Sequence, residues 1–300
     1  MTLAGSLARQ TAAYWDENRH KSQDPSFWMA HPVCRAAINR RVSGSPDEWP
    51  LDWFRRVHAP RPFERGVSFG CGLGGFERSA VRAGIAREID AFDLSPASLQ
   101  EAREAARREG VTGITYRLGD FDDPELARRR YDIAFFHASL HHVSRLERLF
   151  SRLRTALEPG GAIYFDEYIG PSRDRWTEGD LSLARALLDL LPRDAKAREE
   201  LLPPVEPGDP SEAVRSGEIA VFFHRHFETV AWRPYGGQIV DLLFPCLKPE
   251  WLATNEGHAA VRALLGAEDR ELSFDPSRTH HAVAYGRLKR SKLLAWSRRD

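Results

Sequence analysis

Four glycines that directly follow a short apolar run are the first residues whose types and spacing predict chemistry. Residues 65–77 read Arg-Gly-Val-Ser-Phe-Gly-Cys-Gly-Leu-Gly-Gly-Phe-Glu. The apolar run predicts a buried strand at 67–69, and a helical pattern begins at residue 76. Glycines at such a turn adopt backbone angles that other residues avoid, and they let a ligand approach main-chain N–H groups at the helix N-terminus. The stretch therefore predicts a nucleotide-binding loop.

The spacing of the glycines does not identify the ligand. Gly70, Gly72 and Gly75 fit the pattern G-x-G-x-x-G, whereas Gly70, Gly72 and Gly74 fit G-x-G-x-G. Asp93 ends the next predicted strand, 21 positions after Gly72. A carboxylate at this place accepts hydrogen bonds from both hydroxyls of a ribose. A nicotinamide dinucleotide and S-adenosylmethionine both carry such a ribose, so both remain open at this point.

Polar side chains also follow the third and fourth predicted strands. Asp120 and Phe121 come after the third strand, where the acid accepts from the amine of an adenine. Phe121 or Leu94 would lie against the face of the adenine ring. Residues 136–142, at the end of the fourth strand, read Phe-His-Ala-Ser-Leu-His-His. These groups predict an adenine site beside a histidine-containing loop.

Alternating strands and helices must position these side chains. Strands are predicted at 67–69, 88–94, 114–118, 131–136 and 162–168. Helices are predicted between them at 76–83, 96–108, 124–129 and 144–157. This alternation predicts a parallel sheet that is covered on both faces and binds ligands at the carboxyl ends of its strands.

The remaining segments predict a cap and a lid around this α/β unit. Residues 1–60 predict a helical N-terminal cap, whose aromatic residues either pack on the core or cover the cofactor mouth. Residues 61–300 form the main domain, with a Pro-rich, lid-like insertion at about 170–225 that contains a helix at 180–191. Strand patterns return at 228–233 and 280–288, and the last ten residues form a basic tail.

Five motifs in this order resemble the class I S-adenosylmethionine-dependent methyltransferases. They are Phe-Gly-Cys-Gly-Leu-Gly at 69–74, Asp-Leu-Ser at 93–95, Gly-Asp-Phe at 119–121, Ser-Leu-His-His at 139–142 and Leu-Glu-Pro-Gly-Gly at 157–161. The resemblance implies S-adenosylmethionine as cofactor. It also implies a Rossmann-like, doubly wound α/β fold with seven mostly parallel strands, a helical N-terminal cap and an insertion between strands five and six. The expected cofactor-binding residues are Gly70, Cys71, Gly72, Gly74, Asp93, Leu94, Asp120, Phe121 and His137.

One position departs from the pattern of this family. The family usually carries an acid two positions before Gly70, where it helps to order the glycine loop and the amino end of the cofactor's methionine. This chain has Ser68 there. Glu77, in the first turn of the following predicted helix, is expected to substitute in part. An acid at that place also compensates the helix dipole, so both interpretations remain open.

The acceptor side of the site is expected after the fourth and fifth strands. The sulfonium already activates the methyl group, so the protein mainly aligns a nucleophile. A hydroxyl acceptor benefits from a general base, and His141 and His142 are the candidates, with a purely positional role as the alternative. Strand alternation sends Asp166 and Tyr168 to one face and Glu167 to the other. Glu167 and Tyr168 complete the predicted catalytic set, although Glu167 could instead pair with an arginine.

Composition and residue spacing limit the partners. The 43 basic and 43 acidic residues cancel, so neither nucleic acid nor a membrane surface is expected to bind. The chain has no long apolar run and no signal-peptide pattern, which predicts a cytoplasmic protein. Cys34, Cys71 and Cys246 are too scattered for a disulfide framework or a zinc knuckle. His224 and His226 would share one face of a strand, but no spaced carboxylate completes a metal site, so no metal is expected.

The sequence therefore predicts an S-adenosylmethionine-dependent methyltransferase that acts on a small-molecule acceptor. O-methylation is slightly favoured over N-methylation, because the loop after the fourth strand lacks the Asn/Asp-Pro-Pro-Tyr type of sequence that resembles amino-methylating members. The alternatives are an RNA-modifying methyltransferase, a protein that uses the cofactor for other chemistry, and a non-catalytic regulatory partner. Ser68 is the feature that favours the last two. The acceptor and the oligomeric state stay open.

Overall fold

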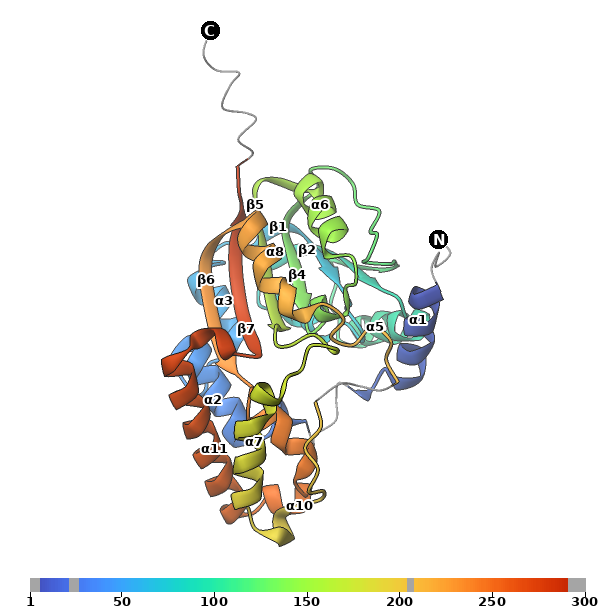
Figure 1. Cartoon of the computed structure of the whole chain (residues 1–300). Coiled ribbons are helices and arrows are strands. Elements are labelled where there is room, and N and C mark those ends of the chain that lie inside the picture. Colours follow the sequence, from blue (N-terminus) through green and yellow to red (C-terminus); the bar gives the residue numbers. More distant parts are fainter. Residues whose placement is uncertain (1–5, 22–26, 204–207, 291–300) are drawn as a thin grey trace.

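A seven-stranded sheet runs through the molecule, as predicted. The computed structural model describes residues 6–21, 27–203 and 208–290. The strand order is β3-β2-β1-β4-β5-β7-β6, and only β7 is antiparallel to its neighbours (Figure 1). The order reverses between β1 and β4, where such sheets bind ligands. The strands are β1 (Phe63–Phe69), β2 (Ala86–Asp93), β3 (Ile114–Leu118), β4 (Tyr131–His137), β5 (Leu157–Tyr168), β6 (Phe227–Gly236) and β7 (His281–Leu288).

Three of the four helices predicted between the first five strands are present. They are α4 (Gly75–Arg82), α5 (Pro96–Arg108) and α6 (Leu146–Ala156). The helix predicted at 124–129 is wrong, because residues 119–130 form turns and irregular backbone. That segment is too short to offset the cost of helix nucleation by itself, and Leu126 is its only large apolar side chain.

Alternate residues of the central strands enter two apolar layers, one on each face of the sheet. Phe69 and Phe136 belong to the layer that α6 covers, and their rings stack with centroids 5.2 Å apart. Tyr164 and Tyr285 face the other layer. Phe54 of α3 (Pro50–Val57) packs there, 4.5 and 5.1 Å from their ring centroids. This division follows from the two-residue period of a strand.

The N-terminal helices pack in three different places. The helix α1 (Ser6–Asn18) lies against α5, beside the carboxyl ends of the first strands (Figure 1). The ring of Trp15 on α1 meets the ring of His142 edge-on at 5.7 Å. In contrast, α2 (Pro32–Ser43) packs on α11 and β6. Phe54 therefore packs in the core, whereas Trp15 lies against His142 of the loop after β4.

A helical layer lies beyond the carboxyl end of β5 and contains α2 together with later helices (Figure 1). Residues 204–207 of the insertion and the predicted basic tail at 291–300 lie outside the described residues. The later helices are α7 (Glu178–Leu190), α9 (Val240–Leu243), α10 (Pro249–Leu252) and α11 (Asn255–Phe274), while α8 (Ile219–His226) packs on α6. Short 3₁₀ helices lie at Trp28–Ala30, Leu140–His142, Arg193–Ala195, Ser216–Glu218, Phe244–Cys246 and Pro276–Arg278.

The predicted placement of His224 and His226 on a strand is wrong. Both lie on α8, and β6 begins only at Phe227. Residues two apart on a helix point in nearly opposite directions, so the two rings do not share a face. Instead, Nδ1 of His224 lies 3.0 Å from the hydroxyl oxygen of Thr229, and the ring of His226 stacks on the ring of Phe222. Within the three described ranges, no helix is both long and apolar enough to cross a membrane.

Candidate active site

The glycine loop between β1 and α4 provides an open backbone surface. Gly70, Gly72 and Gly74 all have φ between 49° and 71°, which favours glycine. A Cβ at Gly70 would come within 2.5 Å of Ser139, but a Cβ at Gly72 would meet nothing within 4 Å. Gly74 is the N-cap of α4, and no side chain caps this helix. The N-terminus of α4 therefore has main-chain N–H groups for an anionic ligand.

Asp93, at the end of β2, shapes the glycine loop directly. Its Oδ2 accepts a hydrogen bond from the Gly72 N–H at 2.7 Å, and its Oδ1 accepts one from the Ser95 N–H at 2.8 Å. Burial raises the pKa of Asp93. Asp16 of α1 accepts a hydrogen bond from the Ser95 hydroxyl at 2.5 Å. One buried carboxylate thus joins the loop to the start of α5, and α1 is tied to the same turn.

A second buried carboxylate lies beneath the glycine loop. The Ser68 hydroxyl donates to Glu77 Oε1 at 2.6 Å, and Glu77 is 1 % exposed. The other oxygen, Oε2, has no hydrogen-bond partner among the described residues. Burial raises the pKa of Glu77 to about 7. A carboxylate from α4 thus lies against Ser68, and its expected substitution for an acid at position 68 stays a prediction.

Glu77→Gln is expected to change the free energy of unfolding differently at two pH values. Relative to the wild type, the variant should be about 2 kcal/mol more stable at pH 8 than it is at pH 5. Folding raises the pKa of Glu77 from 4.5 to about 7. Between these values the folded protein keeps a proton that the unfolded chain has released, so the free energy of unfolding falls as the pH rises. Glutamine removes this dependence. Urea unfolding of both proteins at both pH values measures it, and an equal difference at the two pH values would contradict a raised pKa.

The residues predicted to contact adenine gather at the carboxyl ends of β2 and β3. Leu94 and Phe121 are buried in the same apolar cluster. Asp120 and Phe121 line a cavity of about 340 Å³. Asp120 Oδ1 accepts from the Asp122 N–H at 2.9 Å, and burial raises the pKa of Asp120. The structure therefore brings an apolar ring and an acceptor oxygen to one strand edge, as a site for adenine requires.

Two other predicted cofactor residues lie at the ends of their strands. His137 closes β4, is exposed, and stacks on Phe76 of α4 with ring centroids 5.1 Å apart. Cys71 lies within the glycine loop and is buried, which raises the pKa of its thiol well above the ordinary value. The thiol is therefore uncharged at neutral pH, so Cys71 acts through its small volume and its main chain.

The loop after β4 is held by Glu167 of β5. Ala138 has φ 49°, a conformation uncommon for alanine, and turns the chain sharply at the end of β4. The N–H groups of Ser139 and Leu140 then donate to Glu167 Oε1 at 2.5 and 2.6 Å. The other oxygen of Glu167 lies 2.8 Å from His141 Nδ1. The alternative of an arginine partner is wrong within the described chain, where the partners of this carboxylate are the loop and His141.

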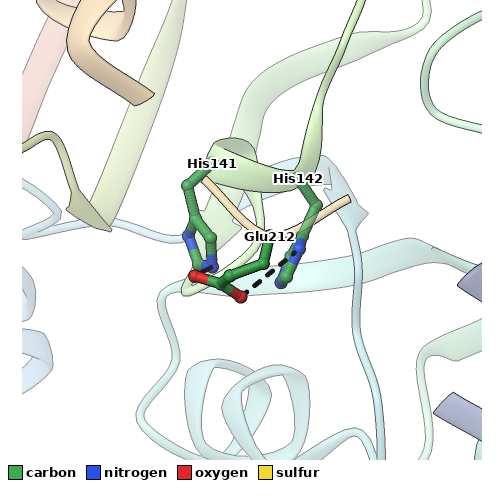
Figure 2. A group of neighbouring side chains, drawn as sticks. All are labelled: His141, His142 and Glu212. Carbon is green, nitrogen blue, oxygen red and sulfur yellow. Dashed lines mark ion pairs between the residues drawn. The ribbon is translucent and has the colours of Figure 1, made fainter. Parts of the chain in front are cut away.

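The insertion brings two acids to the histidine pair. The rings of His141 and His142 lie 4.1 Å apart. Glu212 Oε1 is 3.9 Å from His141 Nε2, and Oε2 is 3.9 Å from His142 Nδ1 (Figure 2). Asp209 Oδ2 lies 3.5 Å from His142 Nδ1. The sequence prediction named no residue of the insertion, although two acids three positions apart in a Pro-rich stretch were a visible signal.

The two histidines have opposite electrostatic surroundings. Burial lowers the pKa of His141, but the nearby carboxylates of Glu212 and Glu167 outweigh burial and raise it to about 9. Burial and the neighbouring charge of His141 hold the pKa of His142 well below its ordinary value. The pair therefore contains one charged and one neutral ring at neutral pH. Three carboxylates, those of Glu167, Asp209 and Glu212, lie beside the two rings.

Tyr168 packs beside the cluster without sharing its hydrogen bonds. Its hydroxyl donates to the Pro171 carbonyl at 2.9 Å, and its ring meets His141 edge-on at 6.2 Å. Asp166 accepts from the Tyr235 hydroxyl at 2.7 Å. The predicted alternation of Asp166, Glu167 and Tyr168 between two faces is therefore present. Of the predicted catalytic residues, the structure brings together His141, His142 and Glu167. The ring of Tyr168 packs against His141 at the side of this group, and its hydroxyl bonds elsewhere.

A family model described as a methyltransferase domain matches residues 67–165, from the glycine loop to the end of β5. The chain contains a class I methyltransferase domain. Sterol methyltransferase-like 2 of Botryococcus braunii is 25% identical over 55% of this chain and 38% of its own length. Phosphoethanolamine N-methyltransferase 2 of Caenorhabditis elegans is 28% identical over 44% of this chain and 30% of its own. The chain thus spans less than half of these curated relatives.

The methyltransferase domain also has solved structural neighbours. One is phosphoethanolamine N-methyltransferase 2 of Haemonchus contortus, in complex with phosphomonomethylethanolamine and S-adenosylhomocysteine. It superposes with a TM-score of 0.54 and 16% identity, over 94% of this chain and 60% of that one. At this identity the likeness shows the fold alone.

S-adenosylmethionine is the cofactor of this class, and the residues present fit it. Nothing lies within 4 Å of the place that a Cβ would take at Gly72, so the main chain is open to a ligand there. The uncapped N-terminus of α4 suits its carboxylate, and Asp93 is positioned at the strand end where the class holds the ribose. Glu77 Oε2, which is buried without a hydrogen-bond partner, suits an ammonium group.

Proposed function

We propose that this chain transfers a methyl group from S-adenosylmethionine to a hydroxyl oxygen of a small-molecule acceptor. The observation that carries the proposal is the contact of Glu167 with both the loop after β4 and His141. It fixes Nδ1 of His141 toward the strand and leaves Nε2 directed to the acidic side chain of the insertion. An oxygen acceptor needs a group that accepts its hydroxyl proton. His141 does this in its neutral form, which the carboxylates around it make the minor form at neutral pH.

The cofactor supplies an electrophilic methyl group, so the protein has to bind, orient and exclude water. Asp93, Gly72 and the start of α4 form the binding side. On the acceptor side, Trp15 and Tyr168 place aromatic rings against His142 and His141. These rings limit the access of water to the histidine pair, which strengthens its electrostatic interactions.

A small acceptor is supported by the cavity beside the end of β5. This cavity has a volume of about 260 Å³, slightly below the usual range of ligand pockets. It lies between the strand ends and the helices α7 and α11, and Gln238 and His280 line it. Gln238 Oε1 and His280 Nδ1 are buried and have no hydrogen-bond partner among the residues that the structure describes. A polar small molecule would satisfy both atoms, because unpaired buried polar groups are costly.

Product analysis tests the proposed reaction. The protein is incubated with S-adenosylmethionine and a panel of small hydroxylated and amino-bearing compounds, and S-adenosylhomocysteine formation and acceptor methylation are followed by mass spectrometry. Methylation of hydroxyl compounds supports the proposal. Methylation of amines alone would replace the oxygen assignment by nitrogen. Absence of binding of S-adenosylmethionine and S-adenosylhomocysteine in calorimetry would overturn methyl transfer itself.

Asp93→Ala is expected to weaken S-adenosylhomocysteine binding by about 1 to 3 kcal/mol, or about 5- to 150-fold. The substitution removes the acceptor for the ribose hydroxyls and also releases the Gly72 N–H that shapes the loop. Calorimetric titration measures the change. Glu88→Ala, on the same strand but exposed and paired with Arg65, is the matched control. Equal affinity of wild type and Asp93→Ala would reject the assignment of Asp93.

A further inference from the structure

We propose that His141, His142, Glu212 and Asp209 form a binding site for one divalent transition-metal ion of the Zn²⁺ type. The histidines come from the 3₁₀ turn after β4, and the acids come from the insertion between β5 and β6. The site therefore joins the methyltransferase domain to its insertion. It goes beyond the proposed function, because metal binding requires neither an acceptor nor methyl transfer.

The donor atoms of three of the four residues already lie close together. The ligand atoms of His141, His142 and Glu212 all lie within 4.8 Å of one another. Figure 2 shows the carboxylate of Glu212 facing both imidazole rings, with 3.9 Å to each nearest nitrogen. Tetrahedral ligands with Zn–N and Zn–O bonds of about 2.0–2.1 Å lie about 3.3 Å apart. The separations therefore have to shrink by at most about 1.5 Å, which rotation of the side chains can supply.

Asp209 gives an independent indication of a missing cation. It is fully buried, and its Oδ1 accepts from both the N–H and the hydroxyl of Ser211 at 2.8 and 2.7 Å. Its Oδ2 has no hydrogen-bond partner in the described chain and points to His142 Nδ1, 3.5 Å away. A buried carboxylate oxygen without a donor is costly, whereas a metal ion at the histidine pair would satisfy it.

Glu167 supplies the support that metal-binding histidines usually have. Such a histidine binds the ion through one ring nitrogen and donates the other N–H to a carboxylate, which fixes the tautomer. Glu167 Oε2 lies 2.8 Å from His141 Nδ1 and leaves Nε2 on the side of Glu212. Glu167, Asp209 and Glu212 also place three carboxylates beside the histidine pair, and carboxylate oxygens are among the ligands that Zn²⁺ takes.

Nitrogen and oxygen donors in equal number suit a borderline ion such as Zn²⁺ or Co²⁺ better than Mg²⁺ or Ca²⁺, which prefer oxygen alone. Glu212 is the more accessible member, because its side chain is 19% exposed. It therefore marks the side from which the ion, and a further oxygen ligand, would enter. If the proposed function holds, this ligand is the acceptor oxygen, and the ion would hold it as a Lewis acid.

Metal titration of the full chain without an affinity tag tests the site. The protein is stripped with EDTA and dialysed, and Co²⁺ is then added while its visible absorption is followed. Zn²⁺ binding is measured by calorimetry. We expect one ion per chain and a Co²⁺ spectrum of four or five ligands. Glu212→Gln and His142→Ala are each expected to weaken binding at least about tenfold. Asp209→Asn gives a second carboxylate variant.

His224→Ala is the matched control, because it removes a histidine from α8 and should leave metal affinity unchanged. S-adenosylhomocysteine binding by each variant shows that it is folded, and it does not depend on the metal. Absence of Zn²⁺ and Co²⁺ binding to the stripped protein would overturn the metal site, and so would equal affinity of wild type, Glu212→Gln and His142→Ala. The cluster would then be an ion-pair network, and the proposed methyl transfer would be unaffected.

Discussion

Glu167→Gln is expected to lower kcat for methyl transfer by about 10²- to 10⁴-fold, with a much smaller change in cofactor affinity. In the native chain, Glu167 accepts from the N–H groups of Ser139 and Leu140 and lies 2.8 Å from His141 Nδ1. Glutamine keeps the shape and one acceptor oxygen for the loop. Its amide then presents N–H groups to His141, which must turn Nδ1 into an acceptor.

The changed tautomer is the reason for the large effect. When Nδ1 of the neutral His141 ring accepts, the single ring proton lies on Nε2, the nitrogen that faces Glu212. That nitrogen can then neither take a proton from an acceptor hydroxyl nor bind a metal ion. Single-turnover rates and S-adenosylhomocysteine titration separate the two quantities. Glu167 acts through His141, so it is a positioning residue.

Asp166→Asn is the matched control for this experiment. Asp166 precedes Glu167 on β5 but lies on the opposite face, where it accepts from the Tyr235 hydroxyl. The same change of acid to amide is therefore made at the residue next to Glu167, on the face of β5 that does not contact the histidine pair. We expect it to retain turnover within about tenfold, as removal of a single hydrogen bond would. If both variants lost activity equally, the effect would belong to β5 as a whole.

The cofactor side of the site was predictable from sequence because its signals are local. A strand, a glycine turn and a helix occupy neighbouring positions, and Asp93 follows at a fixed strand end. Glycine is required where the backbone turns tightly, and an acid at a strand end is placed to bind a ligand. The pattern can therefore be recognised in the sequence before the fold is known. Glu77 also could be proposed, because it lies only nine positions from Ser68 and within the first turn of α4.

The acceptor side was only half predictable because its residues meet across long stretches of chain. His141 and His142 come from the end of β4, while Asp209 and Glu212 come from an insertion with little regular structure. The spacing of apolar residues in a Pro-rich segment does not predict where that segment will pack. Its position depends on tertiary contacts, such as the hydrogen bonds from Arg173 Nη1 to the Asp209 and Pro210 carbonyls at 3.1 Å.

Two errors in the predicted elements have the same physical origin. The segment 124–129 has helix-forming residues but no helix, and His224 and His226 were placed on a strand although they end α8. Intrinsic preference is a weak guide for segments of one or two turns, because packing decides their conformation. In α8, Phe222 and Phe223 are buried against the sheet, and that packing sets the helix.

Glu268→Gln is expected to lower the free energy of unfolding by about 3–5 kcal/mol. Glu268 lies on α11 and is fully buried. Its Oε1 accepts from the N–H groups of Gly237, Ile239 and Val240 at 3.0–3.1 Å. Its Oε2 accepts from Arg41 Nη1 of α2 at 2.7 Å. One carboxylate therefore joins α2, α11 and the chain that leaves β6.

The size of the effect follows from what the substitution leaves behind. Glutamine removes the charge that balances the largely buried guanidinium of Arg41, and its amide has fewer acceptor sites for three N–H groups. Glu48→Gln is the control, because Glu48 pairs with an exposed Arg56 and should cost at most about 1 kcal/mol. Urea unfolding measures both. Equal losses would mean that burial does not strengthen the Glu268 contacts, and the joint between the N-terminal helix α2 and the sheet would have to rest on apolar packing instead.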